Sequence, residues 1–389
     1  MSRGARVPAE LPPLSVYLHL PWCLAKCPYC DFNSHRVPDA PDTARAAYVD
    51  ALLHDITQQA PGVAGRTVET VFLGGGTPSL FTPNEIGRVL TALDQAVNLA
   101  ADAEITMEVN PGALERGSFA GYRAAGVNRV SIGGQSFDAA QLKRLGRLHD
   151  PDAIGNAVDA ARQAGFERIN VDIMYALPEQ SVEAAVADVR SAVALNLTHV
   201  SHYQLTLEPN TVFHAQPPTL PGDDDIADMM QATDAVFAAA GLARYEVSAL
   251  AAPGEACRHN LNYWGFGDYL GIGAGAHGKL SDGEQVSRTV RPSHPRGYVD
   301  ALAAGAAVVS QPVSGSRLAF EYMLNALRLV DGFSLQDFET RTGLPRATVT
   351  GRLAEASERG LMLEREDHIW QPTALGARFL NDLQALFLD

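Results

Sequence analysis

The chain has 389 residues, of which 46% are hydrophobic and 19% charged, which is typical of a folded α/β protein rather than a disordered one. Its formal net charge of −15 disfavours nucleic acid and anionic membranes as partners, because both attract basic surfaces. No apolar run is long enough for a signal peptide or a membrane-spanning helix. We therefore expect a cytoplasmic protein with no integral membrane segment.

Short apolar or β-branched runs alternate with helical patterns along most of the chain. The predicted strands are 16–20, 68–73, 105–109, 130–132, 169–174, 200–205 and, less regularly, 245–248. The predicted helices include 43–59, 84–97, 152–163 and 183–195. Repeated βα units favour a parallel sheet, either doubly wound or closed into a barrel.

Polar residues and glycines lie in or directly after these predicted strands, at Gly74–Thr77, Glu108, Gln135 and Asp172. Barrel enzymes assemble their sites at this end of the strands, so we favour a barrel, which need not be complete.

The pattern changes near Ser314. Helices are expected at 317–329, 335–342 and 345–359, followed by two short strands around Glu366 and a final helix. This order resembles a winged-helix domain. We interpret it as a packing or lid module rather than a DNA reader, because Arg317–Asp389 contains eight arginines and no lysine against eleven acidic residues.

Three of the four cysteines follow the first predicted strand with the spacing C-x3-C-x2-C: Cys23, Cys27 and Cys30. Three thiolates on one loop can bind three irons of a [4Fe-4S] cluster and leave the fourth iron open. An open iron can chelate S-adenosylmethionine (SAM), and one electron from the cluster then cleaves the sulfonium to a deoxyadenosyl radical. The alternative is a zinc site with His19 or His35 as fourth ligand, but a lone three-cysteine loop is not a usual zinc arrangement.

A glycine run, Gly74-Gly75-Gly76-Thr77-Pro78, follows the second predicted strand, where backbone without side chains could approach a ligand. With YLHLPWC, CPYCDFNSH, EVNPG, GGQSFD, LGRLHD and NVDIMYALP, it resembles the coproporphyrinogen-oxidase-like branch of the radical SAM proteins over nearly the whole chain. The resemblance implies a partial (β/α)6 barrel with an α/β extension and a C-terminal winged-helix-like domain. We place the N-terminal tail at 1–13, the barrel at 14–250, the extension at 251–313 and the C-terminal domain at 314–389.

Carried over by position, the resemblance also implies a set of SAM contacts. For the carboxylates in this set the alternative is that they pair with Arg147 or bond a neighbouring loop, since buried carboxylates need partners. The implied contacts are Tyr17, Tyr29, Gly75, Gly76, Thr77, Glu108, Gln135, Arg147 and Asp172.

Two functions compete within this branch: an oxygen-independent coproporphyrinogen III oxidase, which decarboxylates propionates, and a heme chaperone. The oxidases carry a fourth cysteine two positions after the third, where this chain has Phe32. They also have a long segment before the cysteine motif, whereas 22 residues precede Cys23 here. Both differences favour the chaperone.

The segment His259-Asn260-Leu261-Asn262-Tyr263-Trp264 resembles the heme-binding signature of the chaperones. Imidazole is a common axial ligand of heme iron, so we expect His259 to ligate heme, with Asn260, Asn262, Tyr263 and Trp264 around the porphyrin. The alternative is that His259 caps a turn while the aromatic residues fill a core. Cys257 is expected to be inert, and His277, in a glycine-rich turn, is left out of the site.

The expected protein therefore holds a [4Fe-4S] cluster and SAM in its barrel, takes an electron from a one-electron donor, binds heme and delivers it to an acceptor protein. The sequence leaves open whether SAM is cleaved, and it does not identify the donor, the acceptor or the oligomeric state.

Overall fold

The structure is a computed structural model that describes residues 11–112, 118–282, 285–306 and 308–388. The first ten residues of the expected N-terminal tail lie outside this set.

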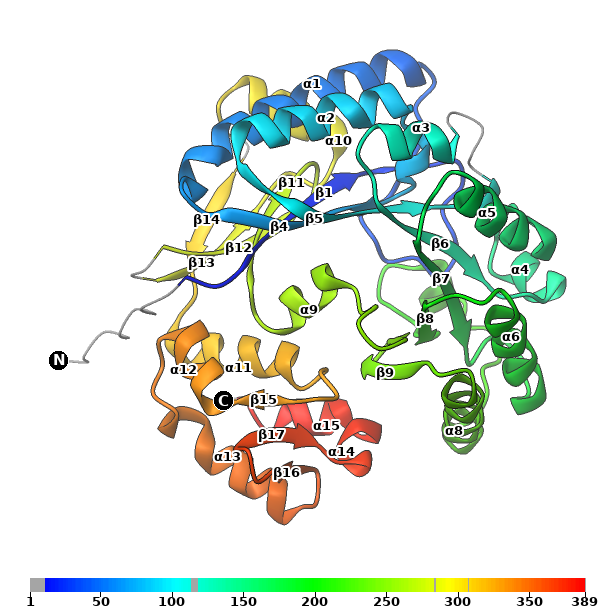
Figure 1. Ribbon diagram of the computed structural model, residues 1–389, viewed down its shortest axis with the longest axis vertical. Helices are drawn as coiled ribbons and strands as arrows, with labels where there is room; N and C mark the ends of the chain where they lie inside the picture. Colours follow the sequence, from blue (N-terminus) through cyan, green and yellow to red (C-terminus); the bar gives the residue numbers. More distant parts are fainter. Residues whose placement is uncertain (1–10, 113–117, 283–284, 307, 389) are drawn as a thin grey trace.

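The centre of the fold is a curved parallel sheet with helices on its convex side (Figure 1). Its six strands are hydrogen-bonded in chain order and each is followed by helical structure, which confirms the partial (β/α)6 barrel; the sheet does not close. These strands are β1 (Leu14–Leu20), β4 (Thr67–Gly75), β5 (Asn98–Val109), β6 (Arg129–Gln135), β7 (Arg168–Tyr175) and β8 (His199–Gln204). The covering helices are α1 (Pro41–Gln59), α2 (Pro83–Ala96), α3 (Phe119–Ala124), α4 (Ala139–Arg144), α5 (Pro151–Gln163), α6 (Val182–Ala194) and α8 (Asp223–Ala239).

The outer helices begin where polar side chains can cap them. Thr82 accepts from the backbone N–H of Glu85 while the Glu85 carboxylate accepts from that of Thr82, so α2 starts with a capping box. The side chains of Asp150 and Ser181 cap α5 and α6 by accepting from the backbone N–H groups of Ala153 and Ala184.

The extension continues the barrel sheet. Strand β11 (Asp268–Ile272) runs parallel to β1 on the side opposite β4, and three antiparallel strands follow it: β12 (His277–Ser281), β13 (Val286–Val290) and β14 (Val309–Pro312). At the other edge the predicted 245–248 strand lies at β9 (Ala243–Glu246), which pairs antiparallel with β10 (Ala249–Ala251) rather than continuing the parallel repeat.

A short helix, α9 (Arg258–Trp264), lies on the concave side of the sheet (Figure 1). It is held at the level where Ser15, Thr70 and Glu104 of β1, β4 and β5 lie side by side. The cysteine loop follows the carboxyl end of β1, so α9 fills the opposite, amino-terminal end of the barrel.

The C-terminal domain has its own core, built around Tyr322, Phe338 and Leu353. Its element order and its three-stranded antiparallel sheet, β15-β17-β16, are those of a winged helix, as expected. The elements are α11 (Gly315–Ala326), β15 (Phe333–Ser334), α12 (Leu335–Thr342), α13 (Ala347–Glu358), β16 (Met362–Glu364), β17 (Ile369–Pro372), α14 (Ala374–Arg378) and α15 (Leu380–Ala385). Among the residues that the structure describes, no helix is long and apolar enough to cross a membrane.

Candidate functional site

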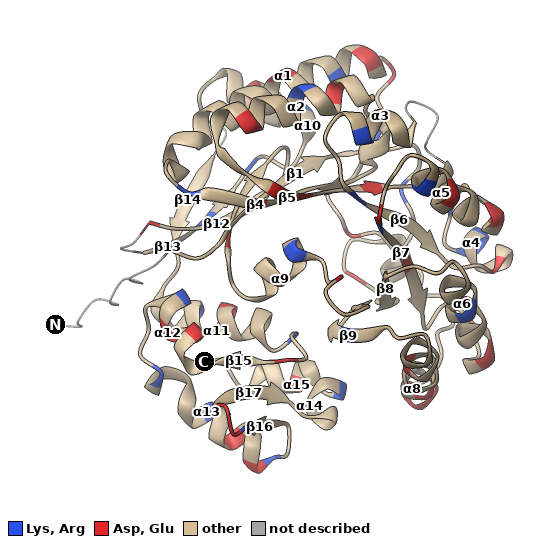
Figure 2. Ribbon diagram, in the orientation of Figure 1, with Lys and Arg blue, Asp and Glu red and all other residues tan. Residues whose placement is uncertain are grey.

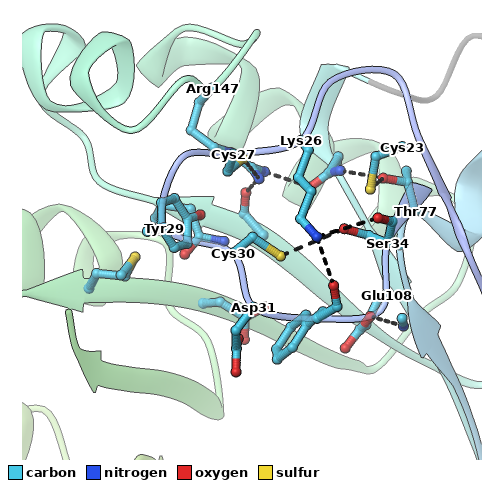
Figure 3. A pocket seen from close by; sticks show the side chains of 18 of the residues that line it. Cys23, Lys26, Cys27, Tyr29, Cys30, Asp31, Ser34, Thr77, Glu108 and Arg147 are labelled. Atoms are coloured by element: carbon cyan, nitrogen blue, oxygen red, sulfur yellow. Dashed lines mark hydrogen bonds between the residues drawn. The ribbon is translucent and has the colours of Figure 1, made fainter. Parts of the chain in front are cut away.

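The three clustered cysteines line a pocket of about 370 Å³ at the carboxyl ends of the barrel strands, here called the barrel-mouth pocket (Figure 3). Each thiol has a polar neighbour: Thr77 Oγ1 lies 3.5 Å from Cys23 Sγ, Ser34 Oγ lies 3.9 Å from Cys30 Sγ, and Arg147 Nη1 lies 3.7 Å from Cys27 Sγ. Such donors can stabilise thiolates that bind a cluster.

These thiols suit a cluster better than a single metal ion. Within the described ranges, no three His, Cys, Asp or Glu side chains converge on one ion site. A cubane spreads its three cysteine ligands over three irons, so wider spacing is compatible with it. Burial raises the pKa of Cys23 and Cys30, so these thiols stay protonated until a metal displaces the protons.

The glycine turn after β4 is fastened to the chain that enters the cysteine loop. The N–H groups of Gly76 and Thr77 donate to the carbonyls of Leu20 and Trp22, each at 2.8 Å. A Cβ on Gly76 would lie 2.6 Å from the Trp22 carbonyl oxygen, closer than packing allows. The protein's own backbone therefore requires this glycine, whether or not a ligand approaches it.

Two carboxylates lie inside the barrel below this turn. Glu108 Oε2 accepts from the Gly75 N–H at 3.0 Å, and burial together with the charge of Asp172 raises the pKa of Glu108 to about 8. Asp172 accepts from Ser131 at 3.2 Å and Asn170 at 2.7 Å, while burial raises its pKa. A cationic ligand with hydroxyl groups would be compatible with both groups.

Arg147 does not take either carboxylate as its hydrogen-bond partner. Its guanidinium donates to Asn110 Oδ1 at 2.5 Å and the Gly133 carbonyl at 2.6 Å, as well as approaching Cys27. The simple pairing of Arg147 with Glu108 or Asp172 that the sequence allowed is therefore not what the structure has. Arg147 instead links β6 to the cysteine loop.

Gln135 has a backbone φ of 73°, which is uncommon for a residue other than glycine. Its side-chain oxygen accepts from the Tyr203 hydroxyl at the end of β8, and both residues line the barrel-mouth pocket. Strained backbone of this kind often marks a site where a side chain must point into a cavity.

The structure brings almost all of the predicted cluster and SAM residues into this one pocket. Tyr17 is the exception: it does not line the pocket but stacks on Phe72 deeper in the barrel, with its hydroxyl on His19 Nδ1 at 3.1 Å. The predicted residues that do line it are Cys23, Cys27, Tyr29, Cys30, Gly75, Gly76, Thr77, Glu108, Gln135, Arg147 and Asp172.

Sequence reasoning missed Asn110, Ser131 and Tyr203, which also line the pocket. Asn110 and Ser131 had a usable signal, because Asn110 directly follows the buried end of β5 and Ser131 is a polar residue between two apolar ones in the buried strand β6. Tyr203 had none, since an aromatic residue in a strand is ordinarily read as packing.

The pocket's residues fit a [4Fe-4S] cluster with SAM: three thiols, a carboxylate pair and a close backbone turn. When both are bound, the cluster would supply the electron that cleaves the sulfonium of SAM. The residues themselves position the parts of the site. Arg147 holds the cysteine loop against β6, and Glu108 orders the Gly75 backbone.

The predicted heme motif is divided between two sides of α9. His259 is 8% exposed, with Nδ1 2.9 Å from Thr70 Oγ1, its ring against Phe72, and its pKa lowered to about 3 by burial. Asn262 donates to Ser15 at 2.7 Å, and Asn260 is half-buried. Tyr263 and Trp264 instead line a second cavity at the C-terminal domain. This conformation therefore gives His259 the surroundings of a core histidine.

Cys257 lies beside His259 in the barrel floor, with Sγ 3.4 Å from Glu104 Oε1. The Glu104 carboxylate also forms ion pairs with Arg129 at 3.5 Å and with Arg168 at 3.2 Å. Burial raises the pKa of Cys257 to about 12, which makes it an inert thiol at neutral pH.

The comparisons with known proteins agree with this geometry. The sequence profile described as the Radical SAM superfamily matches residues 17–192, and that of the HemN C-terminal domain matches residues 313–379. The solved structure of coproporphyrinogen III oxidase from Escherichia coli, a radical SAM enzyme, superposes with a TM-score of 0.80 at 25% identity, covering 98% of this chain and 91% of that one.

Curated relatives are more similar in sequence. The heme chaperone HemW of Escherichia coli is 46% identical over 97% of this chain and 99% of its own length. That of Haemophilus influenzae is 41% identical over 97% of this chain and 99% of its own. That of Mycobacterium tuberculosis is 36% identical over 91% of this chain and 90% of its own. On this full-length similarity, the chain belongs to the HemW family of radical SAM proteins.

Proposed function

We propose that this protein is a heme chaperone, which binds heme and passes it to an acceptor protein while carrying a SAM-coordinated [4Fe-4S] cluster. The observation that carries the proposal is 46% identity to a heme chaperone over nearly the full length of both chains. Residues 251–313, with the motif His259–Trp264, form the extension on which heme binding is proposed to occur.

Cys23, Cys27 and Cys30 are the proposed cluster ligands, and the proposal is supported by their shared pocket and by the hydrogen-bond donors beside each thiol. SAM is proposed to lie between the Gly75–Thr77 turn, Glu108 and Asp172. Exposed apolar side chains on the same loop, Leu24 at 44% and Phe32 at 60%, leave the cluster side of the molecule open to a one-electron donor.

The competing function is oxygen-independent coproporphyrinogen III oxidation, favoured by the superposition on the Escherichia coli oxidase over 98% of the chain. The residue at position 32 disfavours the oxidase function. Phe32 lines the barrel-mouth pocket at the place where the resemblance to the oxidases predicts a fourth cysteine.

One experiment separates the two functions. The full chain, with its cluster reconstituted anaerobically, is titrated with hemin, and the loaded protein is then mixed with a heme-free b-type cytochrome. A second aliquot receives coproporphyrinogen III, SAM and a reductant. Stoichiometric hemin binding and transfer without loss of carbon dioxide supports the chaperone. Decarboxylation without tight hemin binding would overturn the proposal and establish the oxidase.

A further inference from the structure

A second cavity, of about 970 Å³, lies where the extension meets the C-terminal domain. We call it the arginine cavity. One side is the face of β11–β14, from which Tyr269, His277, Arg288, Val290, Val309 and Gln311 contribute. The helix α11 forms the facing side, and the end of α9 closes the cavity with Tyr263 and Trp264. Its size is in the range of pockets that hold cofactor-sized molecules.

The cavity combines flat aromatic surfaces with basic groups. Tyr263 contacts both Trp264 and Tyr269, with ring centroids 4.8 and 5.2 Å apart, and Phe320 lines the α11 side. Arg328 stacks on Trp264, with Cζ 4.2 Å from the ring centroid. A planar, largely apolar ligand with anionic ends would find complementary surfaces here.

Four arginines line this cavity against one acid, Glu321. Glu321 lies within 2.8 Å of Arg288 and 2.9 Å of Arg317, so a single carboxylate serves two guanidinium groups. Asp55 pairs with Arg291 and Glu246 pairs with Arg328, so three carboxylates serve the four arginines and one positive charge remains. The chain as a whole has a net charge of −15, with acidic residues on outer helices such as α6 and α8 (Figure 2).

Three residues that line the cavity each have one buried donor atom without a hydrogen-bond partner: Trp264 Nε1, Arg291 Nη1 and Arg328 Nε. Arg291 is 2% exposed and donates through Nε and Nη2 to Asp55, at 2.6 and 3.0 Å. Arg328 donates through Nη2 to Glu246 Oε2 at 3.1 Å. Buried donors are nearly always satisfied in native proteins, so these side chains retain hydrogen-bonding capacity beyond their present partners. Carboxylates are the acceptors that arginine pairs with best.

His277 is the histidine that lines this cavity. It is the first residue of β12, its side chain is exposed, and it pairs across the sheet with Val290, which also lines the cavity. Partial burial and the charge of Arg288 lower the pKa of His277, which keeps a ring nitrogen lone pair free at neutral pH. His259, in contrast, lies in the barrel floor and is not among the lining residues.

We propose that the heme cargo sits in the arginine cavity with His277 as an axial ligand of the iron and its propionates on the arginines, whereas His259 holds α9 in the barrel. This inference rests on the proposed heme-chaperone function and names the site where that function is carried out. Tyr263 and Trp264 then serve as porphyrin-facing walls at the end of the same helix.

The test uses two probes on the full chain: hemin, and metal-free protoporphyrin IX, which has the same propionates but no iron to ligate. In His277→Ala we expect hemin affinity to fall by at least about tenfold, with a changed axial-ligand spectrum that added imidazole restores. Protoporphyrin IX should bind as in the unsubstituted protein, because its contacts do not include the imidazole.

The matched control is His294→Ala. His294 is an exposed histidine of the same extension, it makes no side-chain cap to its helix, and it does not line the cavity. It should leave the hemin spectrum unchanged.

Three results would overturn the assignment in distinguishable ways. An unchanged hemin spectrum in His277→Ala, with a changed one in His259→Ala, would move the ligand to the barrel floor. Equal weakening of hemin and protoporphyrin IX in His277→Ala would mean that the substitution damages the cavity rather than removing a ligand. Failure of the unsubstituted protein to bind hemin would instead refute the chaperone function itself.

Discussion

The two cavities of this protein differ in the charge of the side chains that line them. In the barrel-mouth pocket Glu108, Arg147 and Asp172 already have protein partners. In the arginine cavity Arg291 and Arg328 also have protein partners, Asp55 and Glu246, and each retains one buried donor without a partner, as Arg147 Nε does at the barrel mouth. The difference lies in the sign of the charged lining: four acidic and two basic side chains line the barrel-mouth pocket, whereas four arginines and one acid line the arginine cavity. The difference predicts that the two sites can be disabled separately.

The most severe test of this separation is Cys27→Ala. Removing one of three thiolates should abolish the visible iron–sulfur absorbance of the reconstituted protein, because a cluster on two thiolates is not held. Hemin should still bind, since Cys27 does not line the arginine cavity. Anaerobic absorbance spectra with and without hemin measure the cluster and the bound hemin. Loss of both the cluster and hemin binding in this variant would show that the two cavities are coupled.

The barrel-mouth pocket can also be disturbed through backbone packing. In Gly76→Ala the new methyl would lie 2.6 Å from the Trp22 carbonyl oxygen, so the turn must shift. We expect destabilisation of about 1–3 kcal/mol in urea unfolding and weaker SAM retention. Gly351→Ala is the control, because a Cβ there meets nothing within 4 Å. Equal stability of the two variants would refute the packing argument.

His259 allows a test of the barrel floor. Its folded-state pKa of about 3 lies below the ordinary 6.5, so the unfolded chain binds a proton first as pH falls. The contribution of neutral His259 to the free energy of unfolding is complete above about pH 6.5. It should decrease toward pH 3 by up to about 1.4 kcal/mol per pH unit. Urea unfolding between pH 7.5 and 5.5 should show a shallower pH dependence in His259→Gln. An identical slope would mean that His259 is not buried.

A smaller effect is expected from the exposed rim of the arginine cavity. The Arg317 side chain is 68% exposed and pairs with Glu321, so Arg317→Ala should fold normally and weaken hemin binding by about two- to fivefold, the value of one exposed charge contact. Arg352→Ala, a 53% exposed arginine of α13 paired with Glu355, is the matched control. Fluorescence quenching by hemin measures both; equal affinities would exclude Arg317 from propionate binding.

Local sequence was sufficient for the strands and helices of the barrel and for the position of the cysteine loop at the end of a strand. Alternating apolar strands such as β7 and capped helices such as α2 have patterns set by neighbours a few residues away. The cysteine spacing is likewise local, and the end of a parallel strand is where such a loop belongs. Tyr203 was missed because its role depends on Gln135, which lies two strands earlier in the chain.

What the sequence by itself determined is the chemistry at the barrel mouth: three thiols, a glycine turn and carboxylates at strand ends. Only the tertiary structure decided on which side of α9 each residue of the His259–Trp264 motif lies. A seven-residue helix turns its successive side chains in different directions, so a contiguous motif need not form one surface. The same limit concealed His277, because β12, β13 and α11 must come together before their side chains can line one cavity.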